Sequence, residues 1–175
     1  MELPGEVYLF NLSILAITFS AVSALVMLLR QTMGGRLSNF DLHLITAYVS
    51  GGFVVALNAI LPPLLSLAEP SPAALWGVAS GLAAAFLTLF VVGLIKKRRH
   101  ASNAFPPTMV AIDWICQGIV ILSLIANALV PTVQGVLLFA AALTSSLAIV
   151  MWSFVRRIGS LLGEKPGEDW DPGRG

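Results

Sequence analysis

The sequence predicts an all-α integral membrane protein with five transmembrane helices, one leading helix followed by two helical hairpins that repeat in the same orientation. Three observations predict this fold. The chain of 175 residues is 57% hydrophobic and 11% charged, whereas soluble domains carry about 25% charged residues. It contains five apolar runs, each near the ~20 residues that a helix needs to cross a bilayer. A pentapeptide of the form Asn-Ala-x-x-Pro occurs twice, at residues 58–62 and 127–131.

Helix-breaking and polar residues separate these runs. The predicted spans are residues 7–29, 42–61, 73–95, 109–130 and 133–155, within one bundle over residues 1–158. The first run follows two glutamates and no cation, so it is a retained span and not a cleaved signal peptide. A Gly34-Gly35 turn follows it, and Pro62-Pro63 predicts the end of the second span because proline lacks the amide proton.

The last two spans are predicted as a hairpin that turns at Pro131. A single helix over residues 109–155 would be about 70 Å long, more than twice the hydrocarbon thickness. Beyond the fifth span, the polar residues 159–175 are rich in glycine and proline. This composition predicts a disordered cytoplasmic tail.

The cations predict the orientation of the chain in the plasma (inner) membrane. With five spans and the N-terminus outside, all ten cations fall on the cytoplasmic side, as the positive-inside rule requires. They are Arg30, Arg36, Lys96, Lys97, Arg98, Arg99, Arg156, Arg157, Lys165 and Arg174. The C-terminus is therefore predicted to be cytoplasmic.

The two pentapeptides align the hairpins with an offset of 69 residues, which pairs Asn58 with Asn127 and Tyr48 with Gln117. Both hairpins start inside, so the repeat is parallel, an arrangement known in some transporters. Five matching residues also leave open a chance resemblance between similar apolar helices.

Six polar residues within the spans are candidates for a pathway or for contacts between helices: Asn11, Tyr48, Asn58, Asp113, Gln117 and Asn127. The three asparagines each lie about one turn from the outer end of a span, so they are expected either to converge in a cluster or to mark polar helix ends near the headgroups. Asp113, Gln117 and Asn127 share one helical face, which is expected to point inward. Asp113 either marks a functional site or serves structure, by complementing the helix dipole or pairing with Arg99.

Small and basic residues predict contacts with other helices and with lipid. Gly51 and Gly52 at mid-span, and Gly77 and Gly81 in the third span, permit the close approach of helices. The run Lys96, Lys97, Arg98 and Arg99 is expected to contact anionic lipid, although a topology signal alone also explains it.

The sequence contains none of the common motifs of hydrolases, P-loop proteins or dinucleotide-binding enzymes. One cysteine and two histidines in different segments predict no metal and no cofactor, and a net charge of +1 predicts no nucleic-acid partner.

The expected partners are the lipid bilayer and either a second copy or another membrane protein. The chain is expected to be non-enzymatic, an oligomeric channel or transporter-like bundle for a small solute or ion. The alternative is a non-catalytic scaffold or accessory subunit of a larger membrane complex.

Reporter fusions test the predicted topology. A reporter at Met1 should be active only outside the cytoplasm and one at Gly175 only inside it, because an odd number of spans separates them. Fusions after residues 36 and 100 should behave like the one at Gly175. Activity of the two terminal reporters in the same compartment would contradict an odd number of spans.

Overall fold

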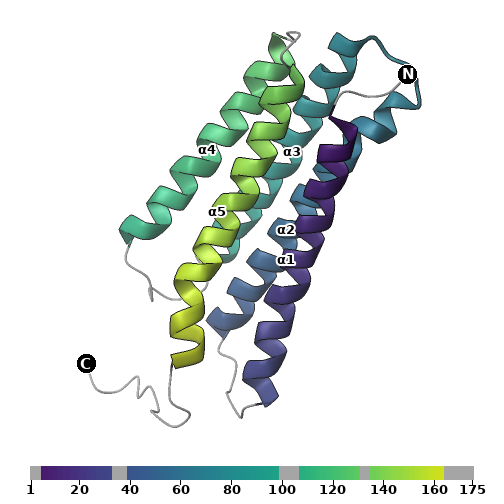
Figure 1. Cartoon of the computed structure of the whole chain (residues 1–175). Coiled ribbons are helices and arrows are strands. Elements are labelled where there is room, and N and C mark those ends of the chain that lie inside the picture. Colours follow the sequence, from purple (N-terminus) through teal and green to yellow (C-terminus); the bar gives the residue numbers. More distant parts are fainter. Residues whose placement is uncertain (1–4, 33–38, 99–106, 131–134, 164–175) are drawn as a thin grey trace.

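Five helices make up the computed structural model, which describes residues 5–32, 39–98, 107–130 and 135–163 (Figure 1). They are α1 Glu6–Thr32, α2 Asn39–Ser66, α3 Pro72–Arg98, α4 Pro107–Leu129 and α5 Gly135–Gly163. All five contain a stretch that is long and apolar enough to cross a membrane. The prediction of an all-helical chain with five such helices is therefore confirmed.

The outer surface of these helices is strongly apolar. Each helix exposes large hydrophobic side chains, such as Ile14 on α1, Leu64 on α2, Leu89 on α3, Ile119 on α4 and Leu137 on α5. Monomeric soluble proteins rarely expose extended apolar surface of this kind. The distribution therefore supports a multi-pass membrane protein with lipid around it.

The helices form an antiparallel bundle in which α5 has the central place. The successive pairs α1–α2, α2–α3, α3–α4 and α4–α5 pack together, and α5 also packs against α1, α2 and α3. Among the described residues, α2 and α4 do not pack against each other. The start of α1, the turn between α2 and α3, the end of α4 and the start of α5 lie at one end of the bundle, and α5 ends at the other (Figure 1).

One continuous core fills the space between the helices. Phe139, Leu143 and Leu147 on the inner face of α5 are at most 2% exposed. Phe154 on the same helix makes edge contacts with Phe19 of α1 and Tyr48 of α2, with ring centroids 5.5 and 5.3 Å apart. Edge-to-face packing is a favoured geometry for aromatic rings, so this cluster ties three helices together.

The end of α2 differs from the prediction. Pro62 and Pro63 do not break the helix, which continues to Ser66. Prolines are tolerated in membrane helices when side chains or neighbouring helices satisfy the backbone groups that they leave unpaired. In the last turn of α2, the Ser66 hydroxyl donates to the Pro63 carbonyl at 2.7 Å. Bonds of the tighter three-residue type then close the helix, such as Leu67 N–H to Leu64 O at 3.3 Å.

Two other helix ends follow from their local sequence. Ser71 caps α3, since its side chain accepts from the Ala74 amide at 3.4 Å, and Pro72 occupies the first helical position, where its missing N–H costs nothing. Helix α5 continues to Gly163, so the prediction of disorder from residue 159 is wrong for residues 159–163. Ile158, Leu161 and Leu162 keep the apolar spacing of a helix there. Residues 164–175 lie outside the described part.

Helices α1 and α2 approach closely because α2 has no side chain at the contact. A Cβ atom on Gly52 would lie 2.7 Å from the Ala16 carbonyl oxygen and would overlap the Ser20 hydroxyl. The Ser20 hydroxyl is within hydrogen-bond distance of the carbonyls of Ala16, at 3.0 Å, and of Val49 on α2, at 3.1 Å. Small residues at a membrane helix interface permit this approach of the two backbones.

Substitution of Gly52 tests this contact. Gly52→Ala should destabilise the bundle by about 1–3 kcal/mol, the range for overpacking in a tight core, because the Ala16 carbonyl is backbone and cannot move aside. Thermal unfolding in detergent measures the change. Gly118→Ala is the matched control, because nothing lies within 4 Å of a Cβ there. Equal stability of the two variants would contradict the packing described here.

Candidate functional site

Hydrogen bonds between α4 and α5 involve three of the six polar residues singled out in the sequence, Asp113, Gln117 and Asn127. Three levels of contact run along these antiparallel helices, and we call them the α4–α5 polar seam. Its residues are Asp113, Gln117 and Asn127 on α4 and Gly135, Ser146, Ser153 and Arg156 on α5. The α4 members are the three residues predicted to share one inward face, and they do point to one neighbouring helix.

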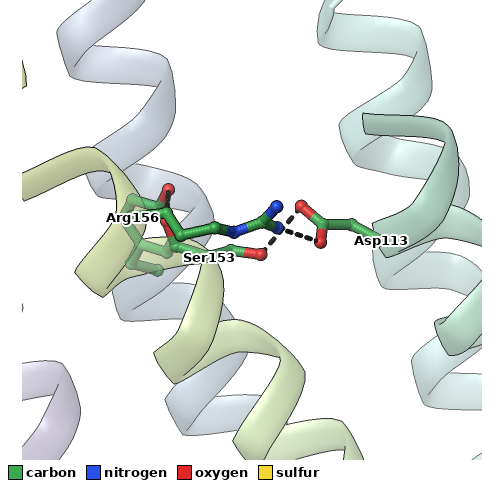
Figure 2. A network of polar contacts seen from close by, with 4 residues as sticks. Asp113, Ser153 and Arg156 are labelled. Atoms are coloured by element: carbon green, nitrogen blue, oxygen red, sulfur yellow. Dashed lines mark hydrogen bonds and ion pairs between the residues drawn. The ribbon is translucent and has the colours of Figure 1, made fainter. Parts of the chain in front are cut away.

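At the first level, near the basic end of the bundle, Asp113 joins two residues of α5 (Figure 2). One carboxylate oxygen accepts from the Ser153 hydroxyl and the other from the Arg156 guanidinium, both at 2.7 Å. The side chains of Arg156 and Asp113 are 26% and 20% exposed, and the guanidinium also lies 5.7 Å from the ring centre of Trp152. The acid thus has a close counterion on α5, and the predicted alternative partner Arg99 lies outside the described residues.

The second level is a reciprocal contact near the middle of the helices. The Ser146 hydroxyl donates to Gln117 Oε1 at 3.2 Å, and Gln117 Nε2 donates to the Ser146 carbonyl at 3.5 Å. Gln117 is 7% exposed. The amide therefore uses one of its two donors and its acceptor oxygen on α5, which fixes the axial register of the two helices.

At the third level, Asn127 connects three helices. Its Nδ2 donates to the Ser80 hydroxyl of α3 at 2.8 Å and to the Gly135 carbonyl at the start of α5 at 3.1 Å. Both donors of the amide are used, whereas Oδ1 is buried without a hydrogen-bond partner in the described part of the chain. The residue is 1% exposed.

The three asparagines predicted at one depth do not form a cluster. Asn58 is fully buried, and its Nδ2 donates to the Val54 carbonyl of its own helix at 2.8 Å. Asn11 is exposed on α1, while Asn127 bonds α3 and α5. Of the two alternatives, convergence is wrong, because Asn11 is exposed on α1 and because α2 and α4 do not pack together among the described residues. Asn58 Oδ1, like that of Asn127, has no described partner.

Tyr48, which the sequence alignment pairs with Gln117, also contacts α5. It is buried, and its hydroxyl donates to the Ser153 carbonyl at 3.2 Å. Ser153 thus receives Tyr48 on its carbonyl while its side chain bonds Asp113. The two aligned positions therefore both reach α5 from different sides, although their chemistry differs.

The remaining predicted residues lie at helix contacts and at the basic end. Gly51 and Gly52 are buried, and Gly77 and Gly81 are half-buried. A Cβ on Gly81 would be 3.9 Å from the Ala128 methyl of α4, an ordinary contact distance. Lys96 is exposed at the end of α3, while the side chains of Lys97, Arg98 and Arg99 lie outside the described part.

Sequence reasoning missed the α5 half of the seam. Ser146, Ser153 and Arg156 follow i, i+7, i+10 spacing, which places them on one helical face. That spacing mirrors the polar face of α4 and was available as a signal. Ser80, the α3 partner of Asn127, stands alone among small residues and gave no comparable signal.

The arrangement of the seam can hold α3, α4 and α5 in register. No group of three or more histidine, cysteine, aspartate or glutamate side chains suited to a metal occurs among the described residues. Comparison of the chain with protein-family models, curated proteins and solved structures yields no match.

A double-mutant cycle tests the Asp113–Arg156 pair. Asp113→Asn should lower stability in detergent by about 1–3 kcal/mol, because it leaves a partly buried guanidinium without its counterion. Arg156→Gln should lower the stability much less in the Asp113→Asn background than in the wild type, because the effects of substitutions at contacting residues are coupled. Ser123→Ala is the control, since that hydroxyl bonds only the Val120 carbonyl of its own helix. Additive effects of the two substitutions would contradict the pair.

Proposed function

We propose that this chain is a non-catalytic scaffold or accessory subunit of a larger complex in the plasma (inner) membrane, with its N-terminus outside and its C-terminus in the cytoplasm. The observation that carries the proposal is the burial of the residues expected to line a pathway. Tyr48, Asn58, Gln117 and Asn127 are all buried within the single chain.

The hydrogen bonds of these side chains support the same conclusion. Gln117 uses its amide on Ser146, Asn127 uses both amide protons on Ser80 and Gly135, and Tyr48 reaches Ser153. A conducting pathway instead needs polar groups that face a wet lumen. Polar groups that bond neighbouring helices hold the bundle together and do not line a pathway. The connections α2–α3 and α4–α5 have only five residues each, so the lateral apolar faces of the helices are the main surface for a partner protein.

The ends of the helices support the orientation. Arg30, Lys96, Lys97, Arg98 and Arg156 lie near the ends of α1, α3 and α5 that face away from the two short turns. Cations concentrate on the cytoplasmic side of membrane proteins. Basic residues next to the bilayer also attract anionic lipid at about 1 kcal/mol each, so this end is the proposed site of lipid contact.

Conduction or transport of a small solute or ion is the second candidate. The observation that favours it is the pair of buried oxygens, Asn58 Oδ1 and Asn127 Oδ1, that lack described partners. A buried acceptor without a donor costs about 1–3 kcal/mol, and an ordered water or a passing solute would remove this cost. An oligomer with a hydrated path beside these two residues would satisfy both.

Reconstitution and purification distinguish the two functions. Liposomes that contain the purified chain should show no flux of monovalent ions or small neutral solutes above protein-free vesicles. The chain purified from native membranes in mild detergent should carry a partner protein at fixed stoichiometry. Flux that falls in both Asn58→Leu and Asn127→Leu, but not in the control Ser123→Ala, would refute the accessory role and establish conduction.

A further inference from the structure

The Asn11 side chain lies on the exposed side of α1, among apolar side chains. Helix α1 packs only against α2 and α5 among the described elements, and its other side is exposed. A stripe of exposed residues on that side follows i, i+4, i+7, i+11, i+14 spacing: Asn11, Leu15, Thr18, Val22 and Leu25. This is the spacing of one seam of a left-handed helix pair.

Asn11 is the member of this stripe with unused hydrogen-bonding capacity. The Thr18 hydroxyl, the other polar group of the stripe, donates to the Ile14 carbonyl of its own helix at 2.8 Å. The Asn11 carboxamide has two N–H donors and one acceptor, and it makes no hydrogen bond with the residues that the structure describes.

The position of Asn11 along α1 places it within the hydrocarbon. The apolar span Glu6–Leu29 has 24 residues, so Asn11 lies ~10 Å from its centre at 1.5 Å per residue. Half of the hydrocarbon thickness is ~15 Å. The carboxamide therefore starts ~5 Å below the hydrocarbon surface, where lipid tails offer no donor or acceptor.

We propose that this face of α1 is the interface of a parallel homodimer, in which the Asn11 carboxamides of two copies hydrogen bond to each other. The inference rests on the proposed membrane location. Copies of one chain insert with the same topology, so a two-fold axis normal to the membrane brings each residue of the seam to the depth of its own counterpart.

The chemistry of the face selects a second copy as the occupant. A carboxamide carries both donor and acceptor, so Asn11 is complementary to itself, and asparagine is known to bridge membrane helices in this way. A second copy always supplies a matching group at the right depth, whereas another protein would need a polar residue there. Residues 7–29 contain no charge, so the two faces meet without repulsion.

Fluorescence resonance energy transfer between copies that carry a donor or an acceptor fluorophore, measured in liposomes, tests the role of Asn11. Asn11→Leu should weaken dimerisation by about tenfold, the size expected when two interhelical hydrogen bonds are lost, and Asn11→Gln should retain most of it. The matched control is Thr18→Val, one heptad further along the same face, which should change the affinity less than twofold. A monomeric wild type, or equal dimerisation of wild type and Asn11→Leu, would overturn the proposal.

Disulfide cross-linking in membranes maps the face independently, in a Cys116→Ser background. Leu15→Cys and Val22→Cys should form dimers on oxidation, whereas Ile17→Cys on another side of α1 should not, although Leu15 and Ile17 are similarly exposed at 49% and 44%. Equal cross-linking at all three positions would refute the interface. Release of the chain by carbonate would refute both the membrane location and the interface, whereas retention without the predicted pattern would refute the interface alone.

Discussion

The bundle depends on the satisfaction of polar side chains by neighbouring helices, with α5 as the common partner. In lipid a polar group has no water to bond, so its partner must come from the protein. Asp113, Gln117 and Tyr48 all find that partner on α5, and Asn127 finds it on α5 and α3. These bonds join α5 to α2 and α4, and α5 also packs against α1 and α3.

These bonds set the arrangement of the helices more than they stabilise it. Hydrogen bonds between membrane helices average about 0.6 kcal/mol each, so the levels of the seam together contribute only a few kcal/mol. Burial of apolar residues of α5, such as Phe139, Leu143 and Leu147, is non-directional and does not by itself select one register. A polar residue such as Gln117 excludes other registers of the two helices, because it bonds Ser146 in only one of them.

The polar groups of the bundle divide into three kinds with different consequences. Many hydroxyls, such as those of Ser23 and Thr88, donate to the carbonyl four residues earlier and need nothing else. The seam residues form hydrogen bonds between helices, so their bonding capacity is taken up within the folded chain. A third group retains unused capacity, the buried oxygens of Asn58 and Asn127 and the exposed carboxamide of Asn11. This third group is where interactions beyond the single chain are expected, because an unpaired polar group in lipid gains most from a new partner.

The sequence by itself determined that the chain forms five apolar helices and which face of α4 points inward, because composition and helical periodicity are local properties. It did not determine that Asp113 meets Arg156, that Asn127 meets Ser80, or that Asn11 faces outward. It also misplaced the end of α2, which continues through Pro62 and Pro63 to Ser66. Only the tertiary structure decided these points, since the partner of a side chain depends on which helices are adjacent and how each is rotated about its axis. Packing over the whole bundle sets both.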